Sequence, residues 1–247
     1  MRTRHMLASA LCALVLLWGC AADEPAAPKD DDPPPPDNAD VTVPCMKDNT
    51  IFDVPDDNSN GAGVYMVVGQ TGSGGNRRGL IQFAVADSVL AGSTIDSVVV
   101  EMHVSLTQAV AHPVRLHKLL ASWGEAGSDA GVGPGGPGSP GPGIGVPAEV
   151  GDATWLRRVY DTVSWTTPGG DFTPTASATT DVGAVGFYTW TSAALKADVQ
   201  DWLDNPGNNH GWILITTETV VSAKRFSTRE NATAANRPKL MLWITEP

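Results

Sequence analysis

Polar and apolar residues alternate along several short segments of this chain. The clearest alternation spans residues 95–106. Its apolar face carries Val98, Val100, Met102, Val104 and Leu106, and its polar face carries Ser97, Glu101, His103 and Ser105. A period of two residues is typical of a strand with one buried face. Shorter segments of this type lie at 49–54, 64–68, 79–85, 114–119, 212–216 and 239–244. This spacing predicts an all-β fold, a β-sandwich of the jelly-roll type.

One segment has the spacing of a helix instead. Leu195, Val199 and Trp202 are separated by four and three residues, so they form one apolar stripe. Ser192 is placed to cap the first turn, and the sequence NPG at 205–207 ends the pattern. We therefore expect one short helix over residues 193–203 beside the strands.

Residues 131–147 are rich in glycine and proline, without the strict glycine period of collagen. Their few larger apolar residues are Val132, Ile144 and Val146. This composition predicts a mobile surface loop.

The N-terminus has the features of an export signal. Arg2 and Arg4 precede an apolar run over residues 6–18, which is short for a resident membrane helix. A small residue followed by Cys20 resembles the bacterial lipobox, in which the cysteine is acylated. We expect a signal peptide over 1–19, lipidation of Cys20, and a surface or outer-membrane lipoprotein that touches the membrane only through its anchor. Ordinary secretion is the alternative.

The following residues, 20–45, are acidic and proline-rich, which predicts an extended tether. The remaining residues, 46–247, are long enough for one folded domain. Cys12 leaves with the signal peptide, so Cys45 is left without an intramolecular partner unless Cys20 is not acylated.

The charge of the chain bears on its partners. Removing residues 1–19 takes away two arginines and no acidic residue, which moves the net charge from −11 to −13. Nucleic acid is bound through lysines and arginines that replace counterions, so a chain this acidic should not bind it.

Several short motifs of the domain occur in an order that resembles the DNRLRE-domain proteins, grouped with carbohydrate-binding module family 96. The motifs are KDNTI at 47–51, Arg78 with LIQF at 80–83, SWGE at 122–125, GDATW at 151–155, Trp165, GGD at 169–171, FSTRE at 226–230 and NRPKL at 236–240. The resemblance covers roughly residues 47–245, although the string that names the family is absent. It implies a jelly-roll β-sandwich on a secreted or surface protein, and polysaccharide binding.

Seven tryptophans follow the tether, and an exposed indole can stack on the apolar face of a sugar ring. Trp155 and Trp165 lie in a segment with little strand alternation, near Arg157 and Tyr160. We expect these four residues to form a glycan-binding surface, with Arg157 available to the carboxylate of an acidic glycan. The alternative is that the tryptophans are core residues, which we expect of Trp202, Trp212 and Trp243.

Four charged residues of the shared motifs are expected to have structural roles. Arg229 and Glu230 are adjacent, so in a strand they would point to opposite faces. We expect them to pair across the fold with Arg78 or Asp171.

The chain also offers oxygen ligands for a structural calcium ion, with no EF-hand spacing. The candidates are Asp48, Asn49, Asp53, Asp56, Asp57, Asn58, Asn60 and Asp171. Polar turns are rich in the same residue types, so ordinary turns are the alternative. No other cofactor is expected.

The sequence contains no Gly-x-Ser-x-Gly or His-Glu-x-x-His motif. Glycoside hydrolysis needs two carboxyl groups about 5 to 9 Å apart, a separation that sequence cannot show. The sequence therefore favours non-catalytic binding of a neutral or acidic polysaccharide. A structural or adhesive module without a glycan ligand is the alternative, and a polysaccharide lyase or glycosidase is less favoured.

Overall fold

The computed structural model describes residues 39–108, 110–133 and 141–247. The predicted signal peptide, Cys20 and the tether up to residue 38 lie outside the described residues. Within the described ranges, no helix has the length and apolar character needed to cross a lipid bilayer.

Two antiparallel sheets share the strand β1 (Val41–Phe52). The first half of β1 pairs with β14, and the second half pairs with β4, after a register shift between Cys45 and Lys47. The first sheet contains β3 (Tyr65–Val68), β13 (Lys224–Ser227), β5 (Thr94–Thr107), β14 (Lys239–Thr245) and β11 (Gly186–Trp190). The second contains β10 (Ala178–Val182), β6 (His112–Lys118), β12 (Trp212–Ile215) and β4 (Arg77–Phe83).

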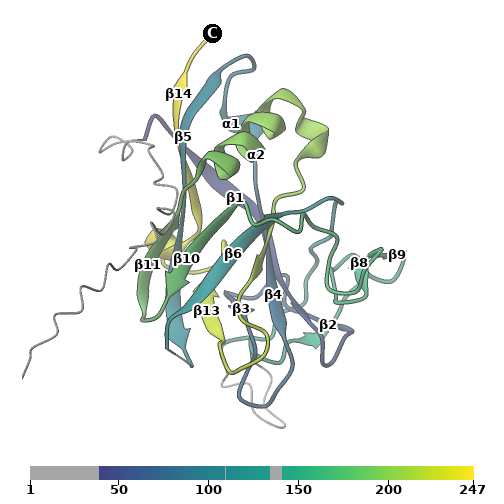
Figure 1. Cartoon of the computed structure of the whole chain (residues 1–247). Helices are drawn as coiled ribbons and strands as arrows, with labels where there is room; N and C mark the ends of the chain where they lie inside the picture. Colours follow the sequence, from purple (N-terminus) through teal and green to yellow (C-terminus); the bar gives the residue numbers. More distant parts are fainter. Residues whose placement is uncertain (1–38, 109, 134–140) are drawn as a thin grey trace, which may run out of the picture. The chain divides into compact units, whose positions relative to one another are not determined.

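Short elements complete the fold (Figure 1). Two small ladders join β2 (Asn58–Ser59) to β7 (Val146–Pro147) and β8 (Arg157–Val159) to β9 (Val163–Ser164). The helical segments are α1 (Val85–Ser88), α2 (Ala193–Asp204) and two 3-10 turns, η1 (Pro206–Asn208) and η2 (Ala234–Asn236).

The main core lies between the two sheets. Val98, Val100, Met102 and Val104 of β5 face it, together with Ile81, Phe83, Trp212 and Leu214 of the second sheet. The alternation predicted for 95–106 is confirmed, except that Leu106 lies beyond the core and is exposed. An all-β sandwich with one short helix is therefore confirmed.

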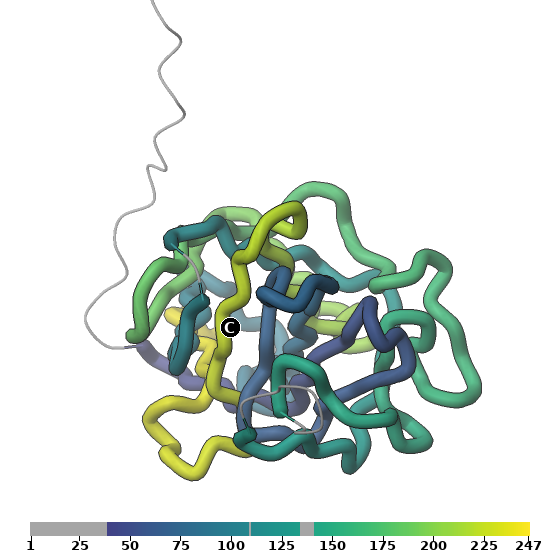
Figure 2. The backbone as a smooth tube through the Cα atoms, turned by 90° about the horizontal axis from the view of Figure 1, so that it is seen from below, coloured from purple at the N-terminus to yellow at the C-terminus, as the bar shows by residue number. Residues whose placement is uncertain are grey.

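The second sheet is also covered on its outer face. Ile51, Leu80 and Ile213 point away from the main core and form a second cluster with Leu119, Trp123, Ala153 and Trp165. The covering residues come from the long connection between β6 and β10, whose green loops lie at one side of the domain in Figure 2. Burial on both faces explains why strands such as β12 read as continuous apolar runs.

The predicted helix is confirmed as α2. The hydroxyl of Ser192 accepts a hydrogen bond from the N–H of Leu195 at 2.9 Å, which caps the first turn. Leu195, Val199 and Trp202 are buried in the main core, and the ring centroid of Trp202 lies 4.4 Å from that of Trp212.

Two predictions about segments outside the predicted strands are wrong. The tether was expected to run to residue 45, yet β1 begins at Val41, because Val43 is buried in the main core and this segment pairs with β14. The segment 131–147 was expected to be a mobile surface loop. Its described part includes β7, and Gly145 packs so closely that an added Cβ would lie 2.6 Å from Cε2 of Phe52.

Candidate functional site

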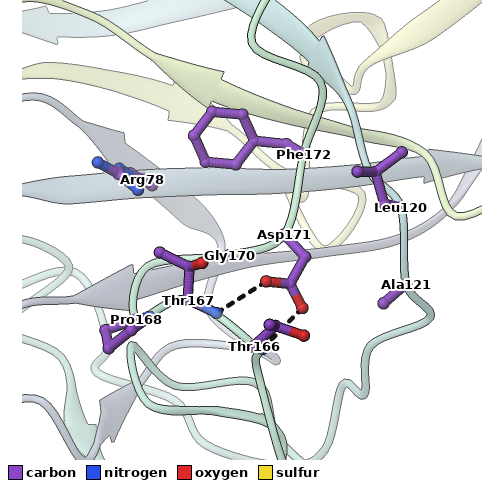
Figure 3. Close-up of a pocket in the computed structure, with 9 residues that line it drawn as sticks. All are labelled: Arg78, Leu120, Ala121, Thr166, Thr167, Pro168, Gly170, Asp171 and Phe172. Carbon is purple, nitrogen blue, oxygen red and sulfur yellow. Dashed lines mark hydrogen bonds between the residues drawn. The ribbon is translucent and has the colours of Figure 1, made fainter.

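A pocket of about 600 Å³ opens beside the covered outer face of the second sheet (Figure 3). This volume is in the range of small-molecule sites. We call it the groove. It is lined by Arg78, Leu120, Ala121, Thr166, Thr167, Pro168, Gly170, Asp171 and Phe172.

The turn over residues 166–172 forms one wall of the groove. Both carboxylate oxygens of Asp171 accept backbone N–H bonds at 2.8 Å, one from Thr166 and one from Thr167 (Figure 3). Gly169 has a φ of +90°, and a Cβ there would lie 2.6 Å from Nη1 of Arg78. The turn therefore requires glycine at this position.

Arg78 also lines the groove but has few donors left for a ligand. Its Nε and Nη2 donate to the two carboxylate oxygens of Glu218 at 2.8 and 2.9 Å, and Nη1 donates to the carbonyl of Gly169 at 2.9 Å. The guanidinium also lies over the ring of Trp155. These contacts agree with a structural role for Arg78, although its expected partners are wrong: it pairs with Glu218.

Part of the groove lining is apolar. Phe172 packs edge-on against His117, with ring centroids 5.3 Å apart. Nδ1 of His117 lies 2.9 Å from the carbonyl oxygen of Thr173, and burial lowers the pKa of this histidine. Leu120 is 59% exposed, so it presents an apolar edge to solvent. The groove thus combines a fixed aromatic ring with hydroxyl and carboxylate oxygens.

The predicted glycan-binding surface does not form as expected. Trp165 is 5% exposed and donates its indole N–H to the carbonyl of Thr154, so the prediction that it forms an open platform is wrong. Trp155 is half-buried beneath Arg78. Arg157 lies in the β8–β9 hairpin and donates to the hydroxyl of Ser164, and the backbone N–H of Tyr160 donates to the carbonyl of Asp152. None of these four residues lines the groove, whereas Arg78 and Asp171 do.

The other tryptophans after the tether are core residues. Trp123, Trp190, Trp202, Trp212 and Trp243 are buried. The core placement expected of Trp202, Trp212 and Trp243 is confirmed.

Three carboxyl groups converge on Arg229. Its Nη2 lies 2.6 Å from Oε2 of Glu125 and 2.8 Å from Oε1 of Glu230, and its backbone N–H donates to Asp48 at 2.9 Å. The expectation that Arg229 and Glu230 point to opposite faces of a strand is wrong, because they follow β13 in a turn and pair with each other. Their expected pairing with Arg78 or Asp171 is also wrong.

Burial shifts the pKa values of this cluster. It raises the pKa of Asp48 well above its usual range, with a further contribution from Glu230. It also raises the pKa values of Glu125 and Glu230, and it lowers the pKa of Lys47 to about 8. Asp48 Oδ1 and Glu230 Oε2 are buried without a hydrogen-bond partner in the described part of the chain. The three carboxyl groups are not among the residues that line the pocket beside them.

The candidate calcium ligands are largely held by protein donors. Asn49 Oδ1 accepts from Ser59 and from the backbone of Asn60, and Asp53 accepts from the backbone N–H of Asn76. Among residues 39–108, 110–133 and 141–247, no three His, Cys, Asp or Glu residues are grouped to hold a metal ion. Asp56 and Asp57 are exposed. Calcium binding therefore stays a prediction.

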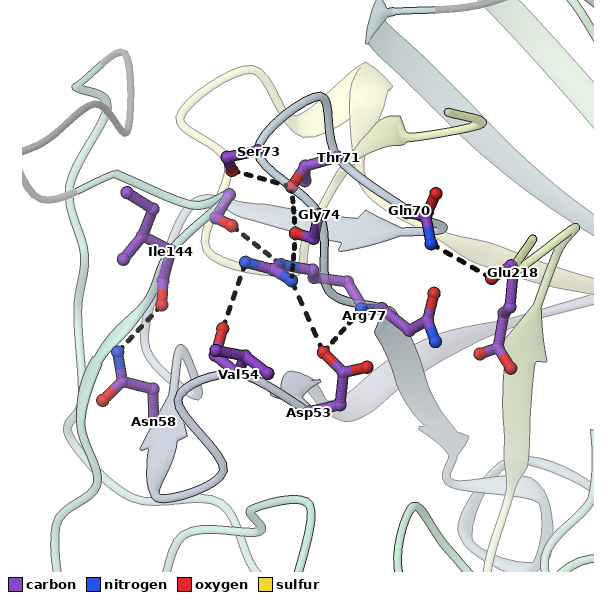
Figure 4. A network of polar contacts seen from close by, with 12 residues as sticks. Asp53, Val54, Asn58, Gln70, Thr71, Ser73, Gly74, Arg77, Ile144 and Glu218 are labelled. Atoms are coloured by element: carbon purple, nitrogen blue, oxygen red, sulfur yellow. Dashed lines mark hydrogen bonds and ion pairs between the residues drawn. The ribbon is translucent and has the colours of Figure 1, made fainter. Parts of the chain in front are cut away.

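A buried arginine joins three loops near these oxygens (Figure 4). Arg77 donates through Nε to the carbonyl of Gly143 at 2.8 Å, through Nη2 to that of Val54 at 3.3 Å and through Nη1 to that of Gly74 at 3.3 Å. Asp53 lies 3.7 Å from Nη1. This network explains why the described end of the glycine- and proline-rich segment is packed.

Five lining residues of the groove were not predicted from the sequence, namely Leu120, Thr166, Thr167, Pro168 and Phe172. One signal was present. Two successive glycines followed by an aspartate indicate a tight turn capped by a carboxylate, and this turn carries most of the lining.

Comparison with protein-family models and with curated proteins identified no relative of this chain. No protein-family model matches the chain, and no curated protein matches it either. The resemblance to DNRLRE-domain proteins therefore stays a prediction that rests on the motifs in the sequence.

Proposed function

We propose that this chain is a non-catalytic polysaccharide-binding module, displayed at the cell surface or secreted, that binds its ligand in the groove. The observation that carries the proposal is the ring of Phe172 beside the oxygens of Asp171 and Thr167. A sugar ring offers an apolar C–H face to an aromatic ring and hydroxyl groups to such oxygens.

The charge of the groove favours a neutral glycan. Glu218 already neutralises Arg78, and the described residues give Asp171 no ion-pair partner. A uronate would therefore meet an unpaired carboxylate, whereas the hydroxyl groups of a neutral sugar can donate to it. The sequence predicted a neutral or acidic glycan, and the charge of the groove favours the neutral one.

A glycan array followed by calorimetry tests the proposal. We expect the full chain to bind at least one neutral polysaccharide, and Phe172→Ala to weaken binding about tenfold, because an aromatic stacking contact is lost. Phe187→Ala is the matched control, since Phe187 is 51% exposed on β11, outside the groove lining. Equal loss in both variants, or no binding by the parent chain, would contradict the proposal.

The same samples test the absence of catalysis. Reducing-end or unsaturated sugar products should not accumulate during incubation with the bound polysaccharide. Their appearance would make the chain a glycosidase or a lyase instead.

A structural or adhesive module is the second candidate. The observation that favours it is the burial of Trp165 with five other tryptophans, which uses these indoles for the core. This candidate predicts an array with no signal above background, while cell-surface display of the chain still promotes cell attachment.

A further inference from the structure

A second pocket, of about 360 Å³, lies where β1 and β14 begin their pairing. It is lined by Thr42, Val43, Pro44, Cys45, Arg229, Arg237, Pro238 and Lys239. Three of these side chains are cationic and none is acidic. The chain as a whole carries a net charge of −11, yet the charged side chains of this lining are all cationic.

The cations differ in how far they are already paired. Lys239 Nζ lies 3.0 Å from Oε1 of Glu101, which occupies one of its three donors. Arg229 uses Nε and Nη2 for Glu125 and Glu230. Arg237 donates through Nε to the carbonyl of Asn231 at 2.8 Å, and it has no ion pair in the described part of the chain.

The backbone around Arg237 holds this side chain in place. Arg237 ends the turn η2, where its N–H donates to the carbonyl of Ala234 at 3.2 Å. Pro238 follows it and is buried. Asn231, which accepts the Nε bond, also accepts the N–H of Thr233 through Oδ1 at 3.0 Å. The guanidinium is therefore held through Nε, and neither Nη group has a hydrogen-bond partner among the described residues.

We propose that this pocket binds a tetrahedral oxyanion, as a sulfate ester or a phosphate group. Arg229, Arg237 and Lys239 come from two different segments of the chain. Each retains N–H groups that can donate hydrogen bonds to the oxygens of one such group. Arginine forks suit this geometry, and Arg237 is the one of the three cations that has no ion pair within the described residues. The site is separate from the groove and does not depend on the proposed function.

Calorimetric titration of the full chain tests this inference with inorganic sulfate, inorganic phosphate and acetate at constant ionic strength. We expect sulfate and phosphate to bind and acetate to bind at least about tenfold more weakly. Glucose 6-sulfate and glucose 6-phosphate then show which source of the group is preferred. Equal binding of acetate would overturn the proposal, because it would show a general anion effect.

Two variants locate the site. Arg237→Ala removes an exposed side chain and should weaken binding about tenfold, and Lys239→Gln should weaken it as well. Lys196→Ala is the matched control, because it removes the same charge from α2. An equal effect of Lys196→Ala and Arg237→Ala would overturn the proposal, as would undiminished binding by both pocket variants with unchanged circular dichroism.

Discussion

Arg78 lies over the indole of Trp155, with its Cζ 4.6 Å from the ring centroid. The same guanidinium forms a bidentate ion pair with the carboxylate of Glu218. One side chain of β4 therefore joins the second sheet to the segment that covers it. The contact also fixes the turn at Gly169, which forms a wall of the groove.

We predict that Arg78→Ala lowers the free energy of unfolding by about 2–4 kcal/mol, because it leaves the half-buried carboxylate of Glu218 without its partner. Urea denaturation measures this change. Arg78→Lys should recover only part of the loss, because an ammonium cannot form the fork. A loss below about 0.5 kcal/mol for Arg78→Ala would show that the contact is not stabilising.

We predict that Gly145→Ala destabilises the fold by about 1–3 kcal/mol, because Gly145 has a φ of +72° and an added Cβ would meet the ring of Phe52. Gly143→Ala is the control in the same segment, since no atom lies within 4 Å of its added Cβ. Thermal denaturation of both variants compares them. Equal melting temperatures would show that the segment does not pack against Phe52.

We predict that stability falls as pH rises from about 4, the usual pKa of a carboxyl group, toward neutral pH through the titration of the cluster around Arg229. Asp48, Glu125 and Glu230 have raised pKa values in the folded state, because burial opposes their charge. The folded chain therefore holds more protons than the unfolded chain in this window, and deprotonation costs stability.

The variant Asp48→Asn isolates this effect. It removes one buried charge and should flatten the fall in urea midpoint between these pH values. The exposed Asp87→Asn serves as control and should follow the parent chain. A parent midpoint that rises with pH over the same window would contradict the assignment.

We predict that Cys20→Ala moves the expressed protein from the membrane fraction to the soluble fraction, because the acyl anchor is lost. Cys45→Ser should leave fractionation unchanged, since Cys45 is a free cysteine within β1. Unchanged fractionation of Cys20→Ala would contradict lipidation and leave ordinary secretion.

The strands that could be predicted are those whose side chains alternate or form long apolar runs. β5 and α2 were expected from their periodicity, and both form. β10, β11 and β13 were not predicted, because threonine, glycine and charged residues interrupt their apolar pattern. Each contributes few apolar side chains to the core, such as Phe226 of β13.

The groove could not be predicted because it depends on pairs far apart in the chain. Arg78 and Glu218 are separated by 140 residues, and Arg78 also lies over the ring of Trp155. The motif around Trp155 and Trp165 gave no sign of which indole the sheet would bury. Local composition predicted an aromatic surface, whereas long-range packing placed a different ring, Phe172, at the pocket.

The sharing of β1 between the two sheets has a mechanical consequence. If the chain is anchored through its N-terminus, a force applied to a ligand in the groove is transmitted to the second sheet and then along β1 to the anchor. Within the sheets, the load falls on the ladders that β1 makes with β4 and β14.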